Sequence, residues 1–375
     1  MDTKIVWATA ILAILGIAVY KTRKMKFRSN LFLFLFMTLF ALLIAEFAYR
    51  FFFREKAIFS TVNHYYNTDP YIGFRFNPGI IKAVEYVENG DTIYNTHYTI
   101  LPDTNNFGID YPMRKGYKSD TSIKETVFLG CSYTLGEGLA DEETLAWQYG
   151  KLAGTSTVNR GCNGMGVHQV YELFKREYAG EDNHNRVFVY SFFHEHFFRA
   201  KGIYPWNVAG PSYIIAGDTL LNQGPFYKVK TMYWQKISKA ASFLGTFTFI
   251  SDNIERIATD RAKRKLSDEN LAPLYLMFRQ MAEIAEKTGG KLILLNWDSD
   301  PPKTGSAILD RDIVDGKIIK TLSHTSAKVL PVRQVIDYSI KQYFIPGDGH
   351  PSALANKALA EYLLEHTRLQ DRDGN

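Results

Sequence analysis

The chain opens with two apolar segments separated by a short basic stretch. The first runs from Ile5 to Tyr20, and the second from Leu31 to about Phe53. An α-helix needs about 20 predominantly apolar residues to cross a bilayer, and Lys4 and Lys21 can extend the shorter segment by reaching towards the interfaces. The pattern therefore predicts a membrane anchor over residues 1–53, with transmembrane helices over 5–20 and 31–53.

Residues 54–120 are rich in Tyr, Thr, Asn and Gly and lack long apolar runs. Within them, "AVEYVENGDTIYNTHYTI" (83–100) places an Asn-Gly-Asp turn between two runs of alternating polarity. This arrangement is typical of a β-hairpin. We expect residues 54–120 to form a small β-rich lead-in ahead of the main domain.

Over residues 121–368, short apolar runs alternate with amphipathic stretches. The apolar runs include "TVFLGC", "RVFVYSFF" and "KLILLNW", and the amphipathic stretches include "VHQVYELFKREYA" and "SALANKALAEYLLEH". Continuous apolar strands alternating with helices indicate a parallel sheet with helices on both faces. The chemistry of such folds lies at the carboxyl ends of the strands.

Residues 201–268 interrupt this alternation. "YIIAGDTLL" is typical of a hairpin, and "FYKVKTMYWQKISKAASFLGTFTFI" is aromatic and amphipathic. The interpretations are a helical insertion packed on the core, a lid over the site, or a surface resting on a membrane. Residues 369–375 are expected to be a frayed tail.

Charge separates the anchor from the rest of the chain. Residues 1–53 carry seven basic and two acidic side chains, a surplus equal to the net charge of +5 of all 375 residues, so the remainder is neutral. A nucleic-acid-binding domain usually carries a basic surplus, so we exclude that class.

The basic stretch also predicts the topology. "KTRKMKFR" holds five basic residues between the apolar segments, and such residues stay on the cytoplasmic side. Everything after about residue 54 is then extracytoplasmic, facing the periplasm from the inner membrane. A cleaved signal peptide is the alternative, but no A-x-A site lies at the end of the apolar run, directly before Lys21. Glu46 and Arg50, four residues apart, pair with each other or contact another membrane protein.

Ser132 is the first candidate for chemistry. It lies in "VFLGCSYTLGEGL" (127–139), directly after an apolar run. A serine hydroxyl attacks carbonyls only when a base accepts its proton and donors stabilise the oxyanion. Alone, the pattern is more typical of a helix cap than of a nucleophile. A phosphate-binding loop is excluded because no Lys follows the glycines.

Two further motifs supply the missing groups. "IPGDGHPS" (345–352) places Asp348 and His350 in one loop, where Asp348 can orient His350 as a base. "VNRGCNGMG" (158–166) follows the second predicted strand, and the N–H of Gly161 can donate to an oxyanion.

Together these motifs resemble the blocks of the SGNH/GDSL hydrolase superfamily, in particular its membrane-anchored bacterial branch. "GCSYTLGEGL" is similar to the nucleophile block, "NRGCNGMG" to the glycine block and "DGHPSALANKALAEYL" to the terminal Asp–His block. The resemblance implies an α/β fold that is flavodoxin-like, with three layers (α/β/α) around a mainly parallel five-stranded sheet. It further implies Ser132 as nucleophile, His350 as base, Asp348 as third member, and the N–H groups of Ser132 and Gly161 as oxyanion donors.

The chain departs from that family in two places. Where the third block has an Asn, the chain reads "SFFHEHFFR", which leaves the third oxyanion donor open. Glu195 or His196 falls nearest to that place, and His194 or His196 could replace the missing donor. A carboxylate cannot donate a hydrogen bond unless it is protonated. Asp348 is also two residues before His350, where much of the family has three. A rival interpretation places His194 and His196 on one face of a strand, binding Zn²⁺ with Asp348 and His350.

Cys131 adjoins Ser132, and Cys162 adjoins Gly161. In an extracytoplasmic space they form a disulfide across the site, or they remain two small buried thiols. The sequence leaves both alternatives open.

The resemblance implies a serine hydrolase that cleaves acyl esters, in the first place O-acetyl esters, on an extracytoplasmic glycan or lipid, with no cofactor and no metal. Two alternatives remain. One is an O-acyltransferase that works with a membrane-bound O-acyltransferase. The other is a non-catalytic envelope scaffold or binding protein on a degenerate hydrolase fold.

Overall fold

The computed structural model describes residues 3–48, 58–60, 66–87, 91–102, 111–226, 256–264, 266, 268–297 and 311–372. The chain divides into two units. One comprises residues 1–57 and 228–260, and the other comprises residues 58–227 and 261–375.

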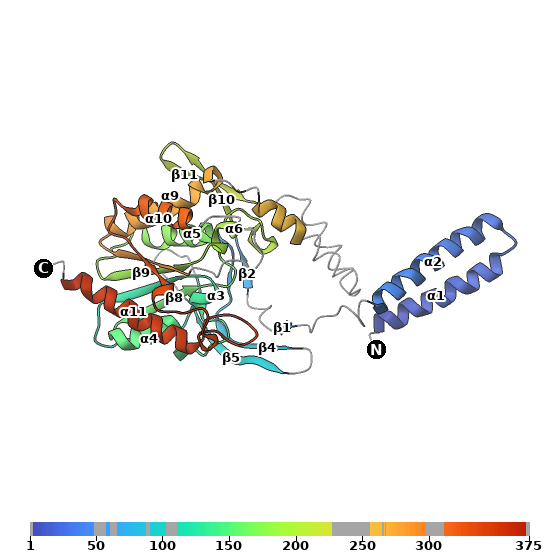
Figure 1. The fold of residues 1–375 in the computed structure, drawn as a ribbon, viewed down its shortest axis with the longest axis horizontal. Helices are drawn as coiled ribbons and strands as arrows, with labels where there is room; N and C mark the ends of the chain where they lie inside the picture. Colours follow the sequence, from blue (N-terminus) through green and yellow to red (C-terminus); the bar gives the residue numbers. More distant parts are fainter. Residues whose placement is uncertain are drawn as a thin grey trace. The chain divides into compact units, whose positions relative to one another are not determined.

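The first unit contains a helical hairpin formed by α1 (Thr3–Thr22) and α2 (Lys26–Ala48) (Figure 1). The helices approach closely at Gly16, where an added Cβ would lie 3.5 Å from the Phe36 ring. Among the described residues, Asn30–Ala48 alone is long and apolar enough to cross a membrane, and Thr9–Thr22 is a shorter apolar helix. The second predicted span therefore meets the length criterion, and its predicted continuation over 49–53 lies outside the described residues. The first predicted span is the shorter apolar helix.

The second unit is built on one sheet of nine strands in the order β1-β4-β5-β6-β8-β7-β9-β12-β13. Strands β8, β7, β9, β12 and β13 are parallel neighbours. Numbered along the chain, these five follow the order 2-1-3-4-5, which is that of a flavodoxin-like sheet. The bounds are β1 (Ile58–Ser60), β4 (Gly79–Val87), β5 (Thr92–Leu101), β6 (Met113–Arg114), β7 (Glu125–Gly130), β8 (Ser156–Gly161), β9 (Arg186–Phe192), β12 (Lys291–Asn296) and β13 (Lys328–Pro331).

The strands from the lead-in continue this sheet, so the expected five strands become nine. The hairpin of β4 and β5 forms as predicted, and its turn at 88–90 lies outside the described residues. The two-residue strand β6 then joins β5 to β8, antiparallel to both. It thereby covers an edge of the parallel sheet whose backbone groups would otherwise be unpaired. A separate pair, β2 (Tyr66–Asp69) and β3 (Gly73–Phe76), completes the lead-in.

Helices cover both faces of the parallel strands, as the alternating pattern predicts. Along β9, Phe188, Tyr190 and Phe192 pack in one hydrophobic cluster while Val189 packs in the other, because successive strand side chains point to opposite faces. The first cluster includes residues of α5 (Val167–Tyr178), α9 (Asp268–Lys287) and α10 (Arg311–Leu322), and the second those of α4 (Leu145–Ala153) and α11 (Ala353–Arg372).

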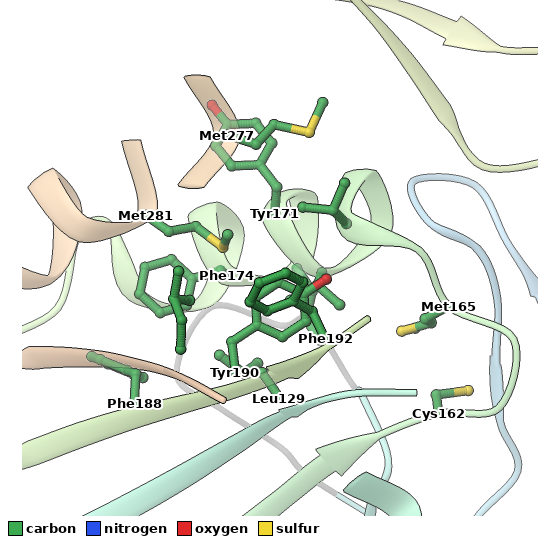
Figure 2. Packing of buried hydrophobic residues seen from close by; sticks show 14 of the residues in the cluster. Leu129, Cys162, Met165, Tyr171, Phe174, Phe188, Tyr190, Phe192, Met277 and Met281 are labelled. Atoms are coloured by element: carbon green, nitrogen blue, oxygen red, sulfur yellow. The ribbon is translucent and has the colours of Figure 1, made fainter. Parts of the chain in front are cut away.

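Aromatic rings dominate the first cluster (Figure 2). The ring centroids of Phe174 on α5 and Phe188 on β9 lie 4.7 Å apart, with nearly perpendicular planes. Met277 and Met281 extend from α9 over the same cluster. Packing of this kind fixes α5, and therefore the loop that precedes it, relative to the sheet.

The insertion over 201–268 contains the predicted hairpin, formed by β10 (Pro211–Ala216) and β11 (Thr219–Pro225). Residues 256–263 are helical. The aromatic amphipathic stretch 227–250 lies outside the described residues, so the packed-helix, lid and membrane-surface interpretations stay predictions. The helix α10 was not anticipated from the sequence.

His168 in the first turn of α5 provides a pH test of this packing. It is fully buried, and burial, together with the nearby Lys201 and Arg199, lowers the pKa of its imidazole to about 3. In this pH range His168 stays neutral in the folded protein but binds a proton in the unfolded chain. The free energy of unfolding therefore falls as pH falls from the unfolded pKa of about 6.5 towards 3.

We therefore expect the free energy of unfolding of wild type to fall between pH 6 and 4 more steeply than that of His168→Gln. The difference in slope should approach about 1.4 kcal/mol per pH unit, the value for one proton. Urea unfolding at several pH values measures it. Equal slopes would show that His168 titrates normally in the folded protein.

Candidate active site

Ser132 is positioned by the end of β7 and the start of the short helix α3 (Ser132–Leu135). Gly130 makes the turn between them with φ of 149°, and a Cβ there would lie 2.2 Å from Oγ1 of Thr134. Only glycine suits this position, because other residues would meet both strain and a clash. The turn places Ser132 in the first turn of α3, where backbone N–H groups have no partner within the helix.

The structure brings the three predicted catalytic residues together. Nε2 of His350 lies 2.8 Å from Oγ of Ser132, and Nδ1 of His350 lies 2.6 Å from Oδ2 of Asp348. Since a carboxylate only accepts hydrogen bonds, Nδ1 carries the proton and Nε2 accepts from the serine hydroxyl. This is the tautomer in which His350 can act as a base towards Ser132.

A tight loop holds Asp348 and His350 in this orientation. The N–H of Ile345 donates to the carbonyl of His350, and the N–H groups of Asp348 and Gly349 donate back to the carbonyl of Ile345. The N–H of His350 also donates to Asp348 Oδ2 at 3.3 Å. The spacing of two residues therefore lets the carboxylate reach both the backbone and the ring of the histidine.

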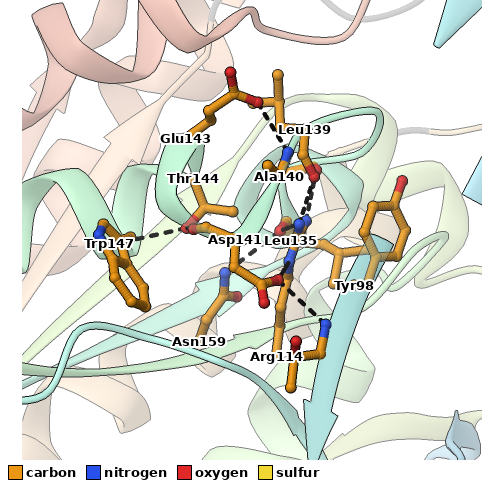
Figure 3. Close-up of polar contacts among 12 residues, drawn as sticks. Tyr98, Arg114, Leu135, Leu139, Ala140, Asp141, Glu143, Thr144, Trp147 and Asn159 are labelled. Carbon is orange, nitrogen blue, oxygen red and sulfur yellow. Dashed lines mark hydrogen bonds and ion pairs between the residues drawn. The ribbon is translucent and has the colours of Figure 1, made fainter. Parts of the chain in front are cut away.

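A buried arginine fixes the loop that follows Ser132 (Figure 3). Arg114, on β6, is 0% exposed and donates to the carbonyls of Leu135, Gly136 and Leu139 at 2.5–2.7 Å. Its Nε donates to Oδ1 of Asp141 at 3.1 Å. The guanidinium thus supplies donors to three buried carbonyls of one turn. The N–H of Leu139 also donates to the Gly136 carbonyl, and Nδ2 of Asn159 to that of Leu135.

Gly161 is placed differently from the sequence prediction. Its N–H donates to Oδ1 of Asn159 at 3.0 Å instead of pointing free into the site. A Cβ on Gly161 would lie 2.2 Å from the backbone nitrogen of Leu135. Its glycine identity is therefore explained by the close approach of β8 to α3.

His194, Glu195 and His196, the candidates for the third block, each contact a residue other than Ser132. His194 contacts Asp315 at 3.3 Å, Nδ1 of His196 lies 3.0 Å from the hydroxyl of Tyr190, and Glu195 accepts from Lys263 at 3.4 Å. The predicted strand ends at Phe192, so the two histidines are not on one strand face, and α6 (Glu195–Arg199) follows instead. Within the described residues, no group of three or more His, Cys, Asp or Glu side chains could hold a metal ion.

Cys131 and Cys162 are both buried, and neither forms a disulfide. They follow Gly130 and Gly161, which are paired in register on neighbouring strands. Burial raises the pKa of the Cys162 thiol well above its usual range. The structure thus shows the two buried thiols, the second of the alternatives open at the sequence level.

A cavity of about 570 Å³ opens beside His350 and Asp348. Its wall includes residues that sequence reasoning missed, namely Tyr66, Phe74, Glu85, Tyr94, Glu137, Asn163 and Trp206. Glu137 is 4% exposed and accepts hydrogen bonds from the hydroxyls of Tyr94 and Tyr98 and from Nδ2 of Asn163. Asn163 lies inside the glycine block and Glu137 inside the nucleophile block, so the sequence motifs could have indicated these two residues. The other residues of this wall come from the lead-in and the insertion, where no motif indicated them.

Substitutions of Arg114 and Asp141 test whether the ion pair between them or the contacts of Arg114 with the carbonyls stabilise the loop after Ser132. Arg114→Met should lower the free energy of unfolding by about 3–5 kcal/mol, because it removes the charged partner of the buried Asp141 carboxylate and one donor from each of three buried carbonyls. Asp141→Asn should cost less, about 1–3 kcal/mol, since the carbonyl contacts persist. Denaturant unfolding of both variants measures the difference. Equal losses would show that the ion pair, and not the carbonyl contacts, carries the stability.

No family model and no curated protein matches this chain. Solved structures similar to it include a protein from Desulfitobacterium hafniense described as lipolytic and of the G-D-S-L family, with 14% identity, TM-score 0.38, and coverage of 64% of this chain and 98% of that one. Another is an acetyl xylan esterase from Butyrivibrio proteoclasticus, with 9% identity, TM-score 0.38, and coverage of 82% and 85%. A third is a carbohydrate esterase family 2 enzyme from Corynascus thermopiles, with 12% identity, TM-score 0.37, and coverage of 76% and 71%.

Proposed function

We propose that this protein is a serine ester hydrolase that works through an acyl-enzyme on Ser132. The observation that carries the proposal is the continuous chain of contacts from Oγ of Ser132 through His350 to Asp348, at 2.8 and 2.6 Å. Residues 218 positions apart in the sequence meet in this geometry. A scaffold protein has no need of such an arrangement, so the non-catalytic alternative is disfavoured.

In the proposed reaction, Oγ of Ser132 attacks the ester carbonyl carbon while Nε2 of His350 takes the hydroxyl proton. The tetrahedral intermediate then expels the alcohol, which leaves with the proton from His350. Water attacks the acyl-enzyme with His350 again acting as base, and the carboxylic acid is released. Asp348 stabilises the imidazolium in both halves.

The oxyanion donors differ from the sequence prediction in this proposal. The N–H of Ser132 remains the first donor. Asn163 is proposed as the second, because its side chain lines the same cavity as His350 and Nδ2 carries two hydrogens, of which Glu137 accepts one. Gly161 is set aside because Asn159 engages its N–H.

The expected location supports an acyl ester of the cell envelope as substrate. The helix Asn30–Ala48 is apolar and only 6% buried over its most apolar window, and its exposed apolar side chains include Phe34 and Phe47. Such a surface suits a lipid environment. We propose an extracytoplasmic glycan or lipid carrying O-acetyl groups as substrate. Transfer of the acyl group to a sugar hydroxyl, with a membrane acyltransferase as partner, is the variant of the same chemistry.

Ser132→Ala tests the enzyme directly. In the full chain, purified in nonionic detergent, it should lower kcat for acetate release from p-nitrophenyl acetate and an O-acetylated glycan by at least about 10³-fold. Ser323→Ala changes an exposed serine at the end of α10 and is the matched control. Mass spectrometry should find a fluorophosphonate adduct on Ser132. Equal rates in wild type and Ser132→Ala would overturn the proposal.

Asn163→Ala tests the second oxyanion donor. It should lower kcat by about 10²-fold with little change in KM, because the donor acts on charge that develops only in the transition state. Asn95→Ala, at an exposed position of β5, controls for the loss of an amide. A rise in KM at constant kcat would instead assign Asn163 to substrate binding.

A further inference from the structure

The cavity beside the triad has an unbalanced set of charged groups. Three carboxyl side chains line it, those of Glu85, Glu137 and Asp348. Its lining contains His350 but neither lysine nor arginine among the residues that the structure describes. A neutral substrate does not require this imbalance, and an anionic substrate would be repelled by it.

The carboxyl groups affect one another across the cavity. Burial, followed by the charge of Asp348, raises the pKa of the half-buried Glu85. Burial also raises the pKa of Glu137, with His350 acting in the opposite direction. Carboxylates that share one desolvated site repel each other, and a cation placed between them relieves this repulsion.

The remaining wall of the cavity is aromatic. Phe74 and Trp206 both approach Gly164, where an added Cβ would lie 3.1 Å from Trp206 and 3.9 Å from Phe74. The Tyr66 ring packs edge-on against Phe74 with centroids 5.7 Å apart. The Trp206 ring stacks on Tyr204 at 4.6 Å, yet Trp206 remains 49% exposed. Aromatic faces beside carboxylates are the combination that recognises organic ammonium groups.

We infer that the cavity binds the ammonium group of a cationic ester, held between Glu85 and the aromatic wall of Tyr66, Phe74 and Trp206, with its carbonyl directed at Ser132. The inference rests on the proposed function, because it takes the cavity beside His350 as the substrate site. It narrows the substrate class to acyl esters in which the acyl group or the alcohol carries a positively charged nitrogen. Neutral sugars also stack on Trp and bind carboxylates, but they leave the charge of Glu85 and Glu137 unbalanced.

Binding is measured first, in a form that does not depend on turnover. The full chain with Ser132→Ala, in nonionic detergent, is titrated calorimetrically with choline and with 3,3-dimethylbutanol, which has the same shape and no charge. Choline should bind at least about tenfold more tightly. Glu85→Gln should weaken choline binding about tenfold, whereas Glu142→Gln, at an exposed position outside the cavity, should not. Absence of saturable choline binding, equal affinity for both probes, or no effect of Glu85→Gln would overturn the inference.

Turnover then separates this inference from the proposed function. Wild type should release acetate from acetylcholine with a kcat/KM about tenfold above that for 3,3-dimethylbutyl acetate, and Glu85→Gln should remove the preference. Ser132-dependent hydrolysis of both esters at equal kcat/KM would leave the hydrolase standing and reject the ammonium site. Tight choline binding without Ser132-dependent hydrolysis of either ester would support the ammonium site and reject the proposed hydrolase.

Discussion

The site depends on the hydrogen bonds that the buried guanidinium of Arg114 donates. Arg114 lies on β6, a strand of two residues between the lead-in and the parallel sheet, and binds three carbonyls of the turn after Ser132. The Tyr98 ring, from β5, lies 4.2 Å from its central carbon. The side chain of Arg114 therefore joins the lead-in to the turn after Ser132. A helix of only four residues has little stability of its own, so Arg114, together with Asn159, whose Nδ2 donates to the Thr134 carbonyl at 2.9 Å, holds it in place.

The lead-in is consequently part of the architecture of the candidate site. Its strands extend the sheet through β6, and Tyr94 and Tyr98 of β5 donate to Glu137, five residues after Ser132. Glu85 on β4 lines the cavity from the same side. The predicted boundary at residue 120 therefore lies within one compact unit, and backbone pairing and buried hydrogen bonds cross it.

The cavity combines groups from parts of the chain that share no local pattern. Tyr66 and Phe74 come from the β2–β3 pair, Trp206 from the insertion, and His350 from the loop before α11. In a doubly wound sheet, loops at the carboxyl ends of the strands gather at one edge, where a substrate can reach all of them. The same geometry that assembles the triad thus also brings carboxylates and aromatic rings around it, and this is what gives the site its proposed selectivity for cationic esters.

The sequence by itself determined the parallel sheet, the helices on both faces, the β4–β5 hairpin and the meeting of Ser132, Asp348 and His350. Each of these follows from local periodicity or from short motifs at strand ends. Only the tertiary structure decided that Gly161 packs against Leu135 with its N–H engaged by Asn159. It likewise decided that His194 contacts Asp315 and that His196 contacts Tyr190, because the strand ends two residues before His194. The partner of a polar group depends on residues distant in sequence, and hydrophobic periodicity carries no information about them.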